Sequence, residues 1–136
     1  MNLSQFHLST AHLRRVLALD AIAGAGAALL HLTLADPLSV WLGLSEGLLR
    51  AAGWALLGYV LLAALLSRQV LPARGPLMLL IVANVVWSVG CLAVAWGGGT
   101  ITPLGQAYLT VLALAVLALA DLEFLGWRAP NLRLAA

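Results

Sequence analysis

The longest apolar stretch of the chain predicts two membrane-spanning helices in succession. From Gly75 to Ala120 there are 46 consecutive residues without a charge. One helix of that length would extend about 69 Å at 1.5 Å per residue, more than twice the ~30 Å hydrocarbon core of a bilayer. The chain must therefore reverse. Three successive glycines and Pro103, within residues 97–103, mark the place where one helix ends and the next begins.

Two further apolar stretches precede this pair and raise the number of expected spans to four. A short segment with two arginines and two prolines, 67–76, separates the second stretch from the third. An Asp-Pro pair at 36–37 ends the first stretch. Residues 38–46 are too few to cross a bilayer, so we expect a loop or a short interfacial helix that carries Trp41. The expected spans are about 13–35, 47–67, 77–96 and 104–125.

These spans predict an all-α fold, an integral membrane four-helix bundle of up-down-up-down topology, in a single membrane domain over residues 1–136. The composition agrees, because 63% of the residues are hydrophobic and 9% are charged, against roughly 25% charged in a typical soluble domain. So small a soluble domain cannot bury that much apolar surface. A soluble enzyme, a disordered chain and a disulfide-stapled domain are therefore excluded. A signal peptide is the alternative for the first span, disfavoured by the span's length and by Asp20.

The arginines predict the orientation of the spans. Cytoplasmic loops of membrane proteins carry an excess of Arg and Lys. Six of the seven arginines fall on one side of the four-span arrangement and Arg50 falls on the other. We therefore expect a location in the cell inner membrane of a bacterium, with both termini cytoplasmic. The formal net charge of +2 is too small to indicate a nucleic-acid partner. The six are Arg14, Arg15, Arg68, Arg74, Arg128 and Arg133.

One polar residue from each span is expected near a common level in the bundle. An aspartate at the centre of a membrane helix costs about 2.5–3.5 kcal/mol, so Asp20 should face the other helices. It would accept hydrogen bonds from Asn84 or Tyr59, pair with an arginine, or be a neutral acid. It is either a proton- or ligand-binding carboxylate or a structural clamp. The predicted intramembrane polar site is Asp20, Tyr59, Asn84 and Asp121.

The last span is expected to present Asp121 to this layer. A stripe of residues on this span leads round the helix to Asp121. Its members are Gln106, Thr110, Ala113 and Leu117. Asp121 and Glu123 also lie near the end of the span. Both are expected to pair with Arg128 or with the arginines at 14–15.

A second polar group is predicted at the opposite end of the bundle. It consists of His31, Arg50 and Gln106, of which His31 and Gln106 have similar depth. Arg50 is expected to pair with Glu46, four residues earlier on the same helix, or with Asp36. His31 is the one histidine inside a span, so neither a bis-histidine haem site nor a zinc site is expected. The prediction contains no cofactor and no metal.

Several short motifs resemble the small four-helix inner-membrane proteins of bacteria, which are mostly uncharacterised. The resemblance covers most of the chain and implies a fold and a location, but no activity. The residues that carry it are Arg15 with Asp20-Ala21, Leu49-Arg50 with Gly53 and Tyr59, Asn84 with Trp87, and Leu104-Gly105.

Size and span count also resemble the small multidrug resistance transporters. That resemblance implies that Asp20 corresponds to their essential carboxylate in the first helix. The chain departs from their pattern because the residue is Asp instead of Glu and lies in the cytoplasmic third. Trp54, Tyr59 and Trp87 are the aromatic residues available to line a cavity.

No catalytic motif occurs in the chain: there is no phosphate-binding loop and no pairing of a nucleophile with a base. The first hypothesis is therefore a non-enzymatic structural or accessory bundle. The alternative is a proton-coupled small-molecule transporter or ligand binder centred on Asp20, and an intramembrane enzyme comes last. The lipid bilayer is the expected partner. The sequence leaves open whether the chain also binds a second copy of itself or a subunit of a membrane complex.

Overall fold

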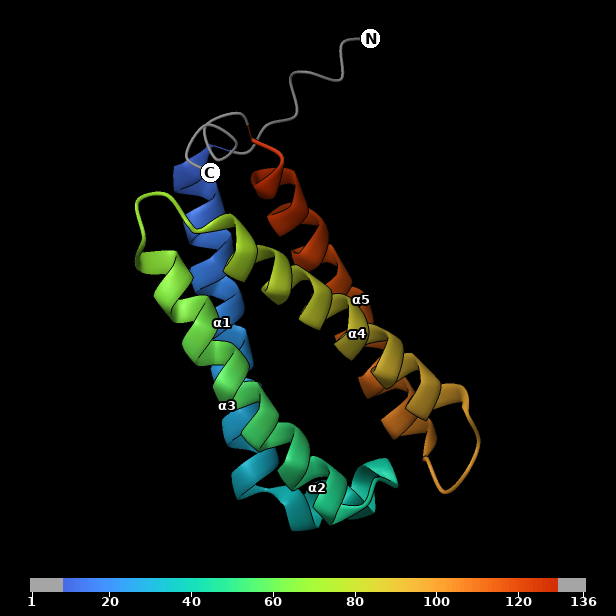
Figure 1. The fold of residues 1–136 in the computed structure, drawn as a ribbon. Coiled ribbons are helices and arrows are strands. Elements are labelled where there is room, and N and C mark those ends of the chain that lie inside the picture. The colour runs from blue at the N-terminus through green and yellow to red at the C-terminus, as the bar shows by residue number, and fades with distance from the viewer. Residues whose placement is uncertain (1–8, 130–136) are drawn as a thin grey trace, which may run out of the picture.

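Five α-helices form between residues 9 and 129, the part of the chain that the computed structural model describes. Four of them are long and apolar enough to cross a membrane, and they alternate in direction (Figure 1). This confirms the predicted all-α four-helix bundle. Arg133, which was assigned to the cytoplasmic side, lies outside the described residues. The helices are α1 (Thr10–Thr33), α2 (Ala35–Leu42), α3 (Glu46–Arg68), α4 (Arg74–Trp96) and α5 (Pro103–Trp127).

Local chemistry accounts for where the helices begin and end. Ser9, Ser45 and Thr102 precede α1, α3 and α5, and each side-chain oxygen accepts a hydrogen bond from the backbone N–H three residues on. Such caps satisfy amide groups that have no partner inside the helix. Between α4 and α5 the chain turns through Gly98 and Gly99, whose φ angles of 87° and 108° favour glycine. The predicted turn at 97–103 is therefore present.

The first span begins and ends a few residues earlier than expected, because α1 runs from Thr10 to Thr33 and residues 35–42 form the separate helix α2. A loop or a short helix was expected between the first two spans, and the structure has a short helix. Gly43 ends α2 with a φ of 69°.

The helices are arranged as two antiparallel hairpins, α1 with α3 and α4 with α5 (Figure 1). Small residues permit the close approach of α1 and α3. A β-carbon on Gly53 would lie 2.7 Å from the Cγ atom of Leu32, and one on Gly24 would lie 2.9 Å from Val60. Close packing of this kind is a main source of helix association in lipid, where no hydrophobic force acts between helices.

Two apolar clusters hold the hairpins together, one at each end of the bundle. The first joins the start of α1, the end of α3 and the start of α4 through residues such as Leu17, Leu66 and Leu80. The second joins α2 to the end of α4 and the start of α5, with Leu42, Ala95 and Leu109 among its members. The middle of the bundle, between these clusters, is where the hairpins leave space.

Hydrogen bonds reinforce the contact of α2 with the turn that precedes α5. The backbone N–H of Thr102 donates to the carbonyl oxygen of Leu42 at 3.1 Å. The Thr102 hydroxyl donates to the carbonyl oxygen of Trp41 at 2.6 Å, and the Thr100 hydroxyl donates to that of Gly43 at 3.0 Å. These hydrogen bonds connect the two hairpins at the end of the bundle that contains α2.

Candidate intramembrane binding site

Four polar side chains, one from each long helix, meet inside the bundle. Asp20 Oδ2 accepts hydrogen bonds from the Tyr59 hydroxyl and, at 3.3 Å, from Asn84 Nδ2. The same Asn84 nitrogen lies 3.2 Å from Glu123 Oε2. Asp20 and Asn84 are 4% exposed and Glu123 is fully buried. We call Asp20, Tyr59, Asn84 and Glu123 the carboxyl cluster.

The structure brings together three of the four residues predicted for this site, and Asp121 is the exception. Asp121 is exposed, and Glu123 occupies the inward position on α5. The two residues are about 200° apart around the helix, because successive residues are about 100° apart. Glu123 lies 18 residues, or five turns, after the buried Gly105, so both face the same side. Because the burial of Gly105 is itself known only from the structure, the sequence alone does not distinguish Glu123 from Asp121.

The two acids of the cluster have no basic partner among residues 9–129. In this part of the chain all ion pairs involve Arg50, so the expected pairing of Asp121 and Glu123 with Arg128 or the arginines at 14–15 is wrong. Glu123 Oε1 is buried and accepts no hydrogen bond from a described residue. Two ionised carboxylates beside one amide nitrogen would repel each other strongly in surroundings of low dielectric constant. A proton or a cationic group between them would relieve that repulsion.

A cavity of about 260 Å³ adjoins the carboxyl cluster, between the two hairpins. Asp20, Tyr59 and Asn84 line it, together with small and apolar residues of all four long helices. Trp87 lies in its wall. Trp54, the other tryptophan considered for such a cavity, is 67% exposed and lies outside the lining.

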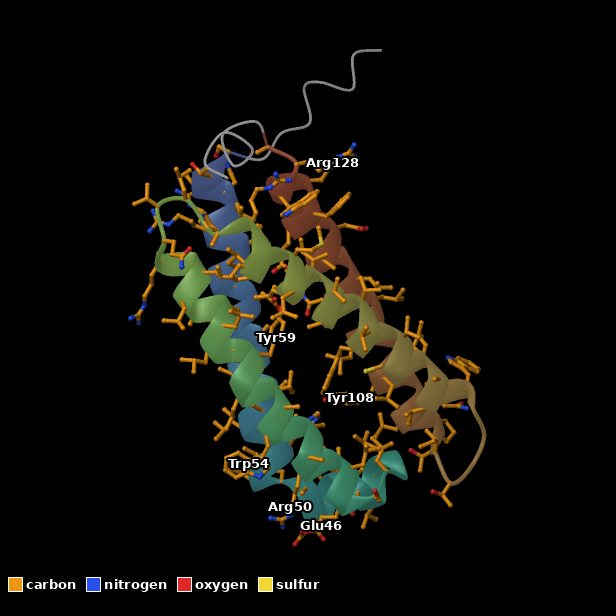
Figure 2. The ribbon with its side chains drawn as sticks, in the orientation of Figure 1. Glu46, Arg50, Trp54, Tyr59, Tyr108 and Arg128 are labelled. Atoms are coloured by element: carbon orange, nitrogen blue, oxygen red, sulfur yellow. The ribbon has the colours of Figure 1, made fainter. Side chains whose placement is uncertain are left out.

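A second cavity, of about 530 Å³, continues the first toward α2. The two share Trp87 and Leu112 in their walls, and Figure 2 shows Tyr59 and Tyr108 directed into the space between the hairpins. Val86 of α4 and Leu48 of α3 line the second cavity and are 64% and 47% exposed. The cavity therefore reaches the outer surface between α3 and α4, where lipid would lie.

His31 lies at the far end of this space, about 16 Å along α1 from Asp20 at 1.5 Å per residue. Its side chain is 3% exposed, and Nε2 lies 2.8 Å from the Tyr108 hydroxyl. Tyr108 is the partner of His31 that the sequence did not identify. Gln106 was expected at this depth, but it is only half-buried and is not part of this pair.

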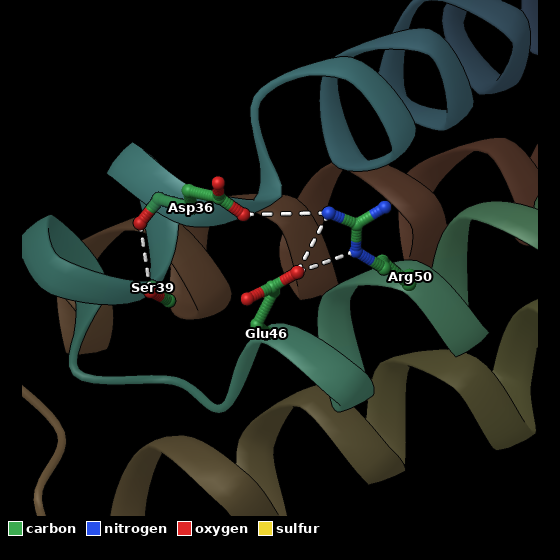
Figure 3. A network of polar contacts seen from close by, with 4 residues as sticks. All are labelled: Asp36, Ser39, Glu46 and Arg50. Atoms are coloured by element: carbon green, nitrogen blue, oxygen red, sulfur yellow. Dashed lines mark hydrogen bonds and ion pairs between the residues drawn. The ribbon is translucent and has the colours of Figure 1, made fainter.

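Arg50 does not join His31 and Gln106, because it lies on the exposed face of α3. Its guanidinium is 2.6 Å from a carboxylate oxygen of Glu46 and 3.4 Å from one of Asp36 (Figure 3). Both partners were predicted. The expected outer polar group is thus two separate features, a buried His31–Tyr108 pair and an exposed ion-pair network.

Within residues 9–129, no group of three His, Cys, Asp or Glu side chains is placed to hold a metal ion. Comparison of the chain with family models, with curated proteins and with solved structures finds no match.

Proposed function

We propose that the protein spans a membrane four times and binds a small lipophilic cation in the cavity between its hairpins, with release of a proton. The observation that carries the proposal is the carboxyl cluster. Its two buried acids have no basic partner among the described residues, and Asp20 lines the cavity. Buried acidic groups in membrane spans are costly and commonly bind protons or ligands.

The shape and lining of the cavity support this class of ligand. Outside the carboxyl cluster its walls are mainly apolar. With the adjoining second cavity, of about 530 Å³, the space is in the size range of sites for small molecules. The aromatic faces of Tyr59 and Trp87 attract positive charge, and Asp20 offers the opposite charge. The opening between α3 and α4 admits a ligand that is already dissolved in the lipid.

Proton release follows from the geometry of the two acids. Asp20 Oδ2 and Glu123 Oε2 both lie within 3.3 Å of Asn84 Nδ2. A proton bound to this cluster and a cation bound beside it neutralise the same charge, so they compete. Binding of the cation should therefore strengthen as pH rises.

The proposal predicts that Asp20→Asn weakens cation binding while the bundle still folds. The amide has nearly the same shape but no charge. Loss of a charged contact worth about 1.5–3 kcal/mol corresponds to a roughly 10- to 100-fold weaker Kd. Titration of tetraphenylphosphonium into the protein in lipid nanodiscs measures the Kd. The pH dependence should be weaker in the variant, where Glu123 is the one acid left in the cluster.

Asp36→Asn is the matched control, because it removes an exposed acid that pairs with Arg50 and lines neither cavity. It should bind the cation as the unaltered protein does. Equal affinity of Asp20→Asn and the unaltered protein across the pH range would contradict the proposal, provided that both unfold at similar temperatures.

A structural or accessory bundle is the second candidate. It is favoured by the hydrogen bonds that Asp20 already accepts from α3 and α4, because they join three helices as a structural clamp would. For this function, Asp20→Asn should lower the stability and leave cation binding unchanged. A membrane protein that co-purifies in a fixed ratio would support it further.

We also propose that the protein lies in a bacterial inner membrane with its arginine-rich end in the cytoplasm. The described arginines at the start of α1, the end of α3, the start of α4 and the end of α5 support this orientation. A reporter that is active only outside the cytoplasm should be active when fused after Gly98 and inactive after Gln69. The reverse pattern would mean the opposite orientation.

A further inference from the structure

We infer that the arginine-rich end of the bundle binds the phosphate headgroup of an anionic phospholipid, with Arg74 and Arg128 as its ligands. This site is separate from the cavity and does not depend on the proposed cation binding. It rests on the distribution of charge, on two guanidinium groups held against aromatic rings, and on buried donors that have no acceptor among the described residues.

The two ends of the bundle differ in how their arginines are neutralised. Figure 2 shows Arg128 at one end and Arg50 with Glu46 at the other. Arg50 pairs with two acids. At the opposite end, no ion pair forms among the described residues, although five arginines gather there. They are Arg14, Arg15, Arg68, Arg74 and Arg128.

Aromatic side chains of α5 hold two of these arginines in place. The Cζ atom of Arg74 lies 4.3 Å from the centre of the Trp127 ring, and that of Arg128 lies 5.6 Å from the centre of the Phe124 ring. The two rings are stacked on each other, with their centres 5.7 Å apart. One aromatic pair therefore restrains both arginine side chains, which lowers the entropy lost when an anion binds them.

The same place contains donors without acceptors. Arg74 Nε and Trp127 Nε1 are buried and make no hydrogen bond within the described structure. Both groups can only donate. Ala73, which precedes α4, offers no side-chain cap, so the first amide groups of this helix lack a side-chain acceptor as well. An anion with several oxygen atoms, such as a phosphate, matches this set of donors.

The surroundings indicate a lipid as the source of the phosphate. Phe124 is 38% exposed and Arg128 lies against its ring, so exposed apolar surface adjoins this guanidinium group. The site also lies where the long helices end, at the level expected for lipid headgroups. A phospholipid satisfies both conditions, because its acyl chains cover the apolar surface while its phosphate meets the arginines.

Native mass spectrometry of the delipidated protein, titrated with phosphatidylglycerol in detergent, tests this inference. The double variant Arg74→Gln with Arg128→Gln should bind the lipid about thirtyfold more weakly, on the scale of the attraction of two arginines to an anionic surface. Arg74→Lys should also bind more weakly, because lysine keeps the charge but lacks the planar fork of donors. Arg50→Gln, at the opposite end, is the matched control and should bind as the unaltered protein does.

Three results would overturn the inference. They are full binding by the double variant, an equal loss in Arg50→Gln, and inorganic phosphate competing as strongly as the lipid itself. If the double variant does not fold, the single variant Arg128→Gln is titrated with the lipid instead, and full binding by it would overturn the inference. Arg128 is exposed and lies against the Phe124 ring of its own helix, so this change should not prevent folding.

Discussion

Gly105→Ala is expected to destabilise the protein by about 3 kcal/mol or more, in the range of severe overpacking. A β-carbon at Gly105 would lie 2.1 Å from the carbonyl oxygen of Leu42. That oxygen belongs to the backbone at the end of α2 and already accepts a hydrogen bond from Thr102, so it cannot rotate away. The added methyl group must separate α2 from α5, and the free energy of unfolding in detergent measures the cost.

Gly47→Ala is the matched control for this prediction. Gly47 lies near the start of α3 as Gly105 lies near the start of α5, but no heavy atom would be within 4 Å of its β-carbon. Alanine is the better helix former, so this variant should gain up to about 1 kcal/mol. If the two variants had the same stability, the close contact between α2 and α5 would not exist in the folded protein.

Asn84→Ala is expected to lower the free energy of unfolding by about 2–4 kcal/mol, because it removes the hydrogen-bond donor between two buried acids. Asp20 would lose one donor and Glu123 its only one among the described residues. Chemical unfolding in detergent measures the change. Ser88→Ala is the control on the same helix, because the buried Ser88 hydroxyl donates only to the backbone oxygen of Asn84.

A double-mutant cycle separates the charge of Glu123 from the packing of Asn84. In the background of Glu123→Gln, the cost of Asn84→Ala should fall, because the remaining amide is less costly to leave unpaired than an acid. Additive effects within about 0.5 kcal/mol would show that the two side chains do not interact. The cycle would then remove the physical basis for proton release from this cluster.

The architecture explains how a cavity can persist in so small a bundle. The two apolar clusters hold the hairpins together at both ends, so the middle need not be filled. Alanine and glycine are frequent in the cavity walls, with Gly24, Ala27, Ala55 and Ala83 among them. Within a hairpin, small residues let two helices approach closely. Between the two hairpins, the same residue types leave the space of the cavity.

The spans, their turns and the pairing of Arg50 with Glu46 follow from the amino-acid sequence alone. Each depends on residues close together in the chain: an uncharged run, three glycines before Pro103, and two opposite charges four residues apart. Hydropathy and backbone chemistry act over such short distances. The all-α fold was therefore predictable without any knowledge of how the helices pack.

The partners of the buried polar groups depended on packing between distant segments. Glu123, and not Asp121, faces the bundle because of how α5 is rotated about its axis. The sequence does not determine that rotation, since hydropathy is nearly the same all round this helix. His31 pairs with Tyr108, 77 residues away, because the hairpins cross at one particular distance and angle. Helix rotation and hairpin separation result from the fit of many side chains at once, which no local pattern in the chain records.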